Sequence, residues 1–211
     1  MTTNNPKLTL PVLAILRGIH PDEVLPIAEV LIAHGITKIE VPLNSPDAFA
    51  SISLLKRTLK GTAFVGAGTV LTCDEVAHLS MIGCELVVSP NYCSDVVKAT
   101  KAAGMVSCPG VFTPSEAFAA LKAGADILKY FPADLCGPAA IRAWRAVLPE
   151  NVEIVATGGT NAGNLGEWLN SGTQMIGVGS WLYRPGDTPA QVGAKATALA
   201  NAYLKYRTQR V

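Results

Sequence analysis

The sequence has few of the residues that build disulfide-stabilised or metal-binding domains. Its five cysteines are odd in number and never occur as C-x-x-C, and its three histidines lie far apart. A disulfide framework needs paired cysteines, and a zinc site needs closely spaced ligands. We therefore expect reduced thiols and no metal ion.

The sequence also lacks a long apolar run and an excess of charge of either sign. Its first apolar run, residues 10–16, is too short to cross a bilayer and is followed by Arg17 rather than by a small-residue cleavage site. A formal net charge of +1 gives no field that attracts nucleic acid or an anionic membrane. We expect a cytoplasmic protein that binds neither, and that holds an anionic ligand through local groups in a pocket.

Apolar residues are abundant instead. The 211 residues are 49% hydrophobic and 16% charged, a composition that allows a large buried core. This length is near the lower limit for a complete (β/α)8 barrel. No long linker or low-complexity segment interrupts the chain, which predicts a single domain over residues 1–211.

Short apolar runs alternate with amphipathic stretches along the whole chain. The eight predicted strands cover residues 12–17, 38–43, 63–70, 86–91, 106–111, 127–132, 153–159 and 175–182. The predicted helices cover residues 22–34, 47–59, 74–81, 94–103, 115–123, 139–147, 162–170 and 189 to about 207.

Strict alternation of strand and helix predicts a parallel sheet covered on both sides. Eight units favour closure into an α/β barrel of the (β/α)8, or TIM, type. An open doubly wound sheet is the alternative. It is disfavoured because no G-x-G-x-x-G turn follows the first predicted strand, as dinucleotide-binding sheets require.

Lys129 interrupts the apolar strand predicted at 127–132. An ammonium group inside a barrel must be paired or neutralised, and the neutral amine is the form that attacks a keto carbon. The alternative is a lysine that extends to a nearby carboxylate or faces the helices. From this position alone, the two readings carry roughly even odds.

Glu40 stands inside the second predicted strand and could share the barrel interior with Lys129. A carboxylate beside an amine that passes through carbinolamine and imine can relay protons at each stage. A buried salt bridge between the two residues predicts the same proximity without chemistry.

Glycine-rich segments end the last two predicted strands, at Gly158-Gly159 and at Gly179-Ser180. In TIM barrels these two loops commonly bind phosphate through exposed backbone N–H groups. Two such loops on adjacent strands favour a phosphorylated substrate, although either could be only a tight turn.

Arg17 and Thr69 follow the same logic at the ends of strands one and three. A guanidinium and a hydroxyl could bind a carboxylate. Alternatively, Arg17 pairs with an acid such as Glu40, and Thr69 caps the helix that begins near Cys73.

Short motifs spread over nearly the whole chain together resemble the KDPG/KHG aldolase family, and most closely its 2-dehydro-3-deoxy-6-phosphogalactonate (KDPGal) branch. The motifs are Ala14-Ile15-Leu16-Arg17-Gly18-Ile19, Glu40-Val41-Pro42-Leu43-Asn44-Ser45-Pro46, Gly66-Ala67-Gly68-Thr69-Val70-Leu71, Ser89-Pro90-Asn91, Cys108-Pro109-Gly110, Leu128-Lys129-Tyr130-Phe131-Pro132 and Gly177-Val178-Gly179-Ser180.

The resemblance implies a class I aldolase, in which Lys129 forms a Schiff base with a 2-keto acid and Glu40 is the catalytic glutamate. It also implies a homotrimer that needs neither metal nor another cofactor. The remaining expected site residues are substrate contacts at Arg17, Thr69, Pro90, Phe131 and Thr157, and phosphate contacts at Gly158, Gly159, Gly179 and Ser180.

Two departures bear on the substrate. Asn44 stands where the gluconate-type branch carries an arginine, which favours the galactonate branch, with Arg17 supplying the positive charge. Thr157 and Trp181, in contrast, resemble the gluconate branch, and Thr157 could bind near the C4 hydroxyl at which the two substrates differ.

We therefore expect cleavage of 2-dehydro-3-deoxy-6-phosphogalactonate to pyruvate and D-glyceraldehyde 3-phosphate. The gluconate epimer (KDPG), 4-hydroxy-2-oxoglutarate, or both epimers together are the alternatives. Two further hypotheses are a sugar-phosphate epimerase that uses Glu40 and Lys129 as acid and base, and a non-catalytic barrel that binds a sugar phosphate.

Overall fold

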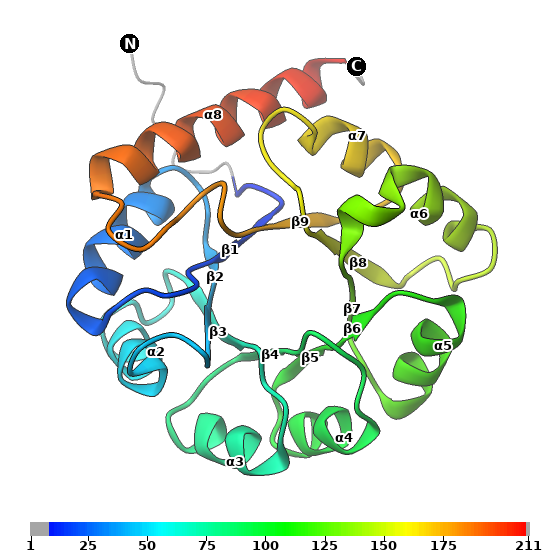
Figure 1. Cartoon of the computed structure of the whole chain (residues 1–211), viewed down its shortest axis with the longest axis horizontal. Helices are drawn as coiled ribbons and strands as arrows, with labels where there is room; N and C mark the ends of the chain where they lie inside the picture. Colours follow the sequence, from blue (N-terminus) through cyan, green and yellow to red (C-terminus); the bar gives the residue numbers. More distant parts are fainter. Residues whose placement is uncertain (1–8, 210–211) are drawn as a thin grey trace.

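The centre of the molecule is a ring of parallel strands with helices around its outside (Figure 1). The computed structural model describes residues 9–209, so residues 1–8 and 210–211 of the predicted domain lie outside it. The strands are β1 (Val12–Ile15), β2 (Lys38–Pro42), β3 (Phe64–Gly68), β4 (Leu86–Val88), β5 (Val106–Cys108), β6 (Gly110–Val111), β7 (Ile127–Tyr130), β8 (Glu153–Thr157) and β9 (Met175–Val178).

Helices follow the strands in the order that the sequence predicts. The predicted α/β barrel is confirmed. The helices are α1 (Pro21–Ala33), α2 (Ala48–Thr58), α3 (Cys73–Met81), α4 (Ser94–Ala102), α5 (Pro114–Ala123), the 3-10 helix η1 (Ala133–Leu135), α6 (Gly137–Arg145), α7 (Leu165–Asn170) and α8 (Pro189–Thr208).

The fifth predicted strand, 106–111, is wrong as a single strand, because the chain breaks it at Pro109. The first part, β5, pairs with β4, and the second part, β6, pairs with β7. Proline has no N–H to donate to a ladder. The Pro109 carbonyl still accepts a hydrogen bond of 2.9 Å from the Lys129 N–H, so the ring stays closed across the break.

Several predicted strands also extend too far at their C-terminal ends. β3 stops at Gly68 because Thr69 has a φ of 55°, and β8 stops at Thr157 because Gly158 has a φ of 114°. A positive φ takes the chain out of the extended conformation. The residues removed from these strands lie in the loops that begin where the strands end.

The helix predicted at 162–170 begins only at Leu165. Two asparagine side chains shape the residues before it. Asn161 N–H donates to Asn164 Oδ1 at 2.9 Å, and Asn164 Nδ2 donates to the Gly159 carbonyl at 2.9 Å. Such side-chain to backbone bonds compete with helix formation and fix this loop beside Gly159.

Apolar side chains fill one end of the barrel and leave the other for polar groups. A cluster inside the ring contains Leu13, Leu86, Val88, Cys108, Val155 and Met175. A larger cluster packs between the strands and the surrounding helices. The cluster inside the ring closes the end at which most strands begin, so a ligand can enter only from the end at which they finish.

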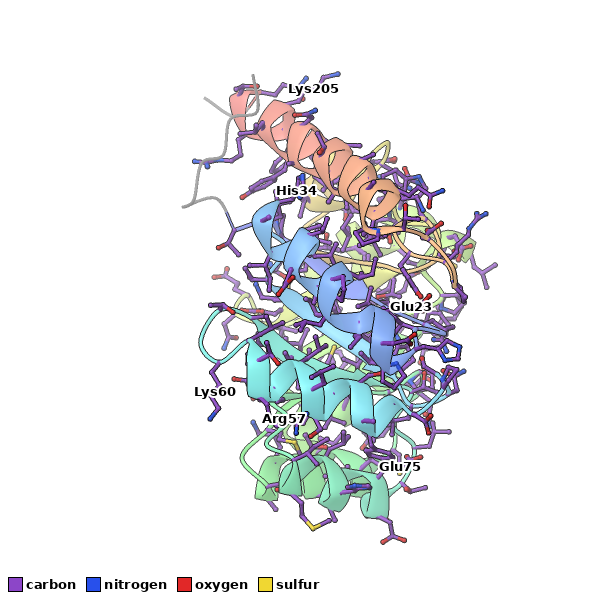
Figure 2. The ribbon with its side chains drawn as sticks, turned by 90° about the vertical axis from the view of Figure 1, so that its left-hand side faces the viewer. Glu23, His34, Arg57, Lys60, Glu75 and Lys205 are labelled. Atoms are coloured by element: carbon purple, nitrogen blue, oxygen red, sulfur yellow. The ribbon has the colours of Figure 1, made fainter. Side chains whose placement is uncertain are left out.

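Figure 2 shows the outer helices side by side and indicates which end that is. Glu23 and Glu75, in the first turns of α1 and α3, lie toward one end, whereas His34 and Lys60, just after α1 and α2, lie toward the other. Each helix begins where the preceding strand has ended, so Glu23 and Glu75 mark the end with the strand C-termini. No helix within residues 9–209 has the length and apolarity to cross a membrane.

Candidate active site

Two ionisable side chains occupy the interior of the barrel. Glu40 of β2 is 1% exposed and Lys129 of β7 is 5% exposed. The three salt bridges among the described residues lie elsewhere, so the alternative of a buried salt bridge between this pair is wrong for this structure. The two groups act on each other through space, and both keep hydrogen-bonding capacity for a ligand.

The Glu40 carboxyl group is set up to carry a proton. Burial raises its pKa above the ordinary value of 4.5, while the positive charges of Lys129 and Arg17 oppose this effect. Its Oε2 atom is buried and has no hydrogen-bond partner. A buried carboxyl group with a free oxygen and a raised pKa can both donate and accept a proton in one reaction cycle.

Glycines at inward positions provide the space that this end of the barrel needs. A Cβ atom at Gly68 of β3 would overlap the Glu40 carboxyl group. A Cβ atom at Gly177 of β9 would overlap the hydroxyl of Thr157 on β8. Glycine is therefore required at both positions by close approach, and the Glu40 and Thr157 side chains take the room that it leaves.

A cavity of about 370 Å³ lies at this end of the barrel, and Glu40, Lys129 and Thr69 are not among its lining residues. It contains seven of the expected site residues, namely Arg17, Phe131, Thr157, Gly158, Gly159, Gly179 and Ser180. The Lys129 Nζ lies 4.9 Å from the centroid of the Phe131 ring, which connects the buried amine to the cavity wall. Among residues 9–209, no three His, Cys, Asp or Glu side chains gather closely enough to hold a metal ion.

The Thr157 hydroxyl is buried and makes no hydrogen bond. Thr157 is 6% exposed, and its Oγ1 atom has no hydrogen-bond partner in the structure. A buried hydroxyl without a partner costs free energy, and native structures rarely tolerate it. Because Thr157 also lines the cavity, this oxygen is placed to bind a ligand hydroxyl.

The loop after β8 has a fixed backbone. Gly158 and Gly159 have φ angles of 114° and 65°, and a Cβ atom at Gly158 would lie 2.9 Å from the Ala133 nitrogen. The Gly159 carbonyl accepts hydrogen bonds from the side-chain amides of Asn161 and Asn164. These hydrogen bonds fix the loop in place where Gly158 and Gly159 line the cavity.

Arg17 and Thr69 meet as expected, and Asn44 joins them. Arg17 Nη1 donates to Asn44 Oδ1 at 2.6 Å and to Thr69 Oγ1 at 3.5 Å. The two alternatives for this pair are wrong, because Arg17 makes no salt bridge with Glu40 and because Thr72, not Thr69, caps α3. The guanidinium is thus held by neutral groups and can bind a carboxylate.

Pro90 is the expected site residue that contributes least to this geometry. It does not line the cavity, and its backbone lies against Gly110, where a Cβ atom would overlap the Pro90 carbonyl. Asn161 and Arg184, in contrast, line the cavity without having been predicted. Asn161 could have been found from its spacing to Asn164, which is typical of a side-chain-bonded loop.

Comparisons with known proteins agree with this geometry. A family model described as KDPG and KHG aldolase matches residues 4–191. The chain is 45% identical over 198 residues to a probable 2-dehydro-3-deoxy-6-phosphogalactonate aldolase of Rhizobium meliloti, covering 94% of this chain and 93% of that protein.

Two solved structures extend the comparison to three dimensions. A native KDPGal structure matches with a TM-score of 0.93 at 41% identity, covering 96% of this chain and 98% of that chain. A KDPG aldolase from Legionella pneumophila, with pyruvate captured as a covalent carbinolamine intermediate, matches with a TM-score of 0.79 at 27% identity, covering 98% of both chains. The chain therefore belongs to the KDPG/KHG aldolase family.

Proposed function

We propose that the protein is a class I aldolase that cleaves 2-dehydro-3-deoxy-6-phosphogalactonate to pyruvate and D-glyceraldehyde 3-phosphate. The observation that carries the proposal is the burial of Lys129 and Glu40 inside a barrel whose cavity is lined by two glycine loops and by Phe131, the ring that Lys129 Nζ approaches. Higher identity to the galactonate relative, 45% against 32% for the gluconate aldolase of Zymomonas mobilis, supports the choice of substrate.

The reaction begins with attack of the Lys129 amine on C2 of the keto acid. Glu40 passes protons to the carbinolamine so that water leaves and the imine forms. Glu40, directly or through water, then takes the proton of the C4 hydroxyl. The C3–C4 bond breaks, its electron pair moves into the imine to give an enamine, and the aldehyde leaves. Protonation of the enamine carbon and hydrolysis release pyruvate and restore Lys129.

Two groups of side chains hold the substrate on either side of the reacting carbons. Arg17, supported by Asn44 and Thr69, binds the carboxylate. The loops at Gly158-Gly159 and Gly179-Ser180 bind the phosphate. Binding at both ends fixes the distance between C2 and the Lys129 amine, which converts binding energy into orientation. Phe131 covers the imine.

The unpartnered Thr157 hydroxyl favours a second candidate function on the same site. It can bind the C4 hydroxyl of a substrate, and the two epimers present that group in different directions. Activity on the gluconate epimer beside the galactonate epimer is therefore the alternative that a specific observation supports.

The protein acts as a homotrimer in the cytoplasm. Leu71, just after β3, is 50% exposed and Leu135, just after β7, is 71% exposed. These are two single leucines at separate positions around the ring, and the head-to-tail contacts of a three-fold assembly would join two different surfaces of each subunit. All five cysteines are free, and Cys73 and Cys136 are exposed, as suits a reducing compartment.

Borohydride reduction in the presence of pyruvate tests the mechanism. We expect a pyruvate-derived mass on the Lys129 peptide of the wild type and none in Lys129→Ala. A coupled assay for pyruvate then compares the two C4 epimers, and we expect faster release from the galactonate substrate. An epimerase would interconvert substrates without forming the adduct, and a non-catalytic barrel would release no pyruvate; either result would refute the proposal.

A further inference from the structure

We propose that Arg184 provides the positive charge that binds the phosphate group of the substrate. The inference rests on the proposed function and concerns the phosphate end of the same cavity. Arg184 lies after β9 and lines the cavity together with Gly158, Gly159 and Ser180. None of these three neighbours carries a positive charge, and a guanidinium would strengthen phosphate binding through charge-assisted hydrogen bonds.

The Arg184 side chain is held against the phosphate loop. Its Nε donates a hydrogen bond of 3.1 Å to the Ser180 carbonyl. Its backbone N–H donates to Asp187 Oδ2 at 3.0 Å, which fixes the loop from the other side. The guanidinium is therefore anchored through one nitrogen beside Ser180, and its two Nη groups make no hydrogen bond within residues 9–209.

The charge of Arg184 is not balanced by a nearby salt bridge. The closest candidate, Asp187, binds Lys195 at 2.6 Å instead. That hydrogen bond is the main effect that lowers the pKa of Asp187, and the nearby charges of Lys195 and Arg184 add to it. No carboxylate in the described part of the chain forms a salt bridge with Arg184, so its charge is available to an anion in the cavity.

The cavity lining has one other cation, Arg17, and it has a different task. Arg17 binds Asn44 and Thr69 at the carboxylate end. In this arrangement each arginine binds one anionic group of the substrate. Neither guanidinium forms a salt bridge with a carboxylate in the described part of the chain. A guanidinium also presents paired N–H groups that match phosphate oxygens, which an ammonium does not.

The two arginine-bearing loops are packed on each other, which fixes their separation. Gly18 follows Arg17 with a φ of 82°, and a Cβ atom there would lie 2.7 Å from Cγ of Pro185. Pro185 follows Arg184 directly. The Gly18 backbone and the Pro185 ring therefore pack closely, and this contact holds the segments that carry Arg17 and Arg184 beside each other.

Arg184→Gln tests the proposal against Arg142→Gln. Arg142 is an exposed arginine on α6 that does not line this cavity, so the control removes the same charge elsewhere. Each variant is assayed with the phosphorylated substrate and with its unphosphorylated analogue. For Arg184→Gln we expect kcat/KM on the phosphorylated substrate to fall about 10- to 100-fold, mainly through KM, as loss of a charge-assisted hydrogen bond predicts.

The other measurements should change little. On the unphosphorylated analogue, Arg184→Gln should stay within about two-fold of the wild type, and Arg142→Gln should match the wild type on both substrates. Arg184→Lys should recover part of the lost kcat/KM. Equal losses on both substrates, or an unchanged KM for the phosphorylated one, would overturn the assignment.

Two binding measurements separate this inference from the proposed function. Borohydride trapping of pyruvate reports on Lys129 and should be intact in Arg184→Gln. Isothermal titration with inorganic phosphate reports on the anion site alone, and we expect weaker binding to Arg184→Gln than to the wild type. A wild type that traps no pyruvate would refute the aldolase, whereas equal phosphate affinity in both proteins would refute the role of Arg184.

Discussion

Arg17 donates its shortest hydrogen bond, 2.6 Å, from Nη1 to the side-chain oxygen of Asn44. The two residues follow neighbouring strands, β1 and β2, whose register brings Ile15 beside Glu40. The sequence suggested that Arg17 replaces a positive charge missing at position 44. The structure places the two side chains in contact, so Asn44 orients Arg17, the cation that replaces the missing arginine.

Asn44→Ala should weaken binding at the carboxylate end without changing the fold. The Arg17–Asn44 hydrogen bond is exposed and orients Arg17 rather than the ligand, so its loss should weaken binding by about 0.5 to 1.5 kcal/mol. We expect a rise of about 2- to 10-fold in the pyruvate concentration that gives half-maximal borohydride trapping. Exposed Asn170→Ala is the control. Unchanged trapping would show that Arg17 needs no support.

Gly68→Ala should reduce activity through Glu40. The added methyl group overlaps the Glu40 carboxyl group, which must move away. A displacement of a catalytic group by about 1 Å can cost about 100-fold in rate, so we expect kcat to fall by about 10- to 100-fold.

Gly166→Ala, in α7, is the matched control for this substitution. Its new methyl group would lie 3.6 Å from Cδ2 of Tyr206, an ordinary contact. We expect unchanged kcat and a free energy of unfolding higher by about 0.5 to 1 kcal/mol from better helix propensity. Wild-type activity in Gly68→Ala would contradict the requirement for glycine beside Glu40.

Thr157→Val should change the preference between the C4 epimers. It replaces an unpartnered buried hydroxyl by a methyl group of similar size, so the free energy of unfolding should stay equal or rise by up to about 1 kcal/mol. The ratio of kcat/KM for the two epimers should shift by about 5-fold or more.

Thr160→Val provides the contrast. The Thr160 hydroxyl donates to the Gly177 carbonyl at 2.7 Å, so this substitution should lower the free energy of unfolding by about 1 kcal/mol or more. Chemical denaturation and parallel assays on both epimers test both variants. An unchanged epimer ratio in Thr157→Val would show that the hydroxyl does not bind at C4.

Glu40→Gln should alter how stability depends on pH. Burial raises the pKa of Glu40 in the folded state above 4.5, so its contribution is favourable while it is protonated and is lost as the pH rises through the folded-state pKa. Glutamine does not titrate. The free energy of unfolding of Glu40→Gln relative to the wild type should therefore increase as the pH rises from 4.5, the ordinary pKa of a glutamate, toward neutrality.

Urea denaturation across this range measures the difference, with Glu150→Gln at an exposed position as the control. A difference that stays flat or falls with pH would contradict the raised pKa. Activity should be lost at every pH, because glutamine cannot relay protons.

The barrel and its two interior charged residues were predictable because each can be recognised from residues that are neighbours in the sequence. Apolar runs separated by amphipathic stretches indicate strands and helices, and Lys129 and Glu40 stand out as charges within such runs. The strand ends were less predictable. The run 153–159 continues into Gly158 and Gly159, and only their backbone conformation shows that the strand has ended.

Arg184 and Asn44 illustrate what sequence patterns leave out. Arg184 stands in a loop with proline and glycine, where an arginine is ordinary, and only the fold places it beside loops from β8 and β9. Asn44 was noticed for what it replaces, but its contact with Arg17 depends on neighbouring strands in register. Both roles arise from residues far apart in the chain.

The break at Pro109 makes one position of the ring unlike all the others. β4 and β7 are joined there through a single chain segment, whose two halves pair with different neighbours. If the original ends were joined and the chain were opened in a helix-to-strand turn, no strand would be cut and all eight strand pairs could still form. New ends at Pro109 would cut the link between β5 and β6 and release the strand that holds Lys129 in register. We therefore expect circular permutation to be tolerated at the helix-to-strand turns around the barrel, but not at Pro109 beside Lys129.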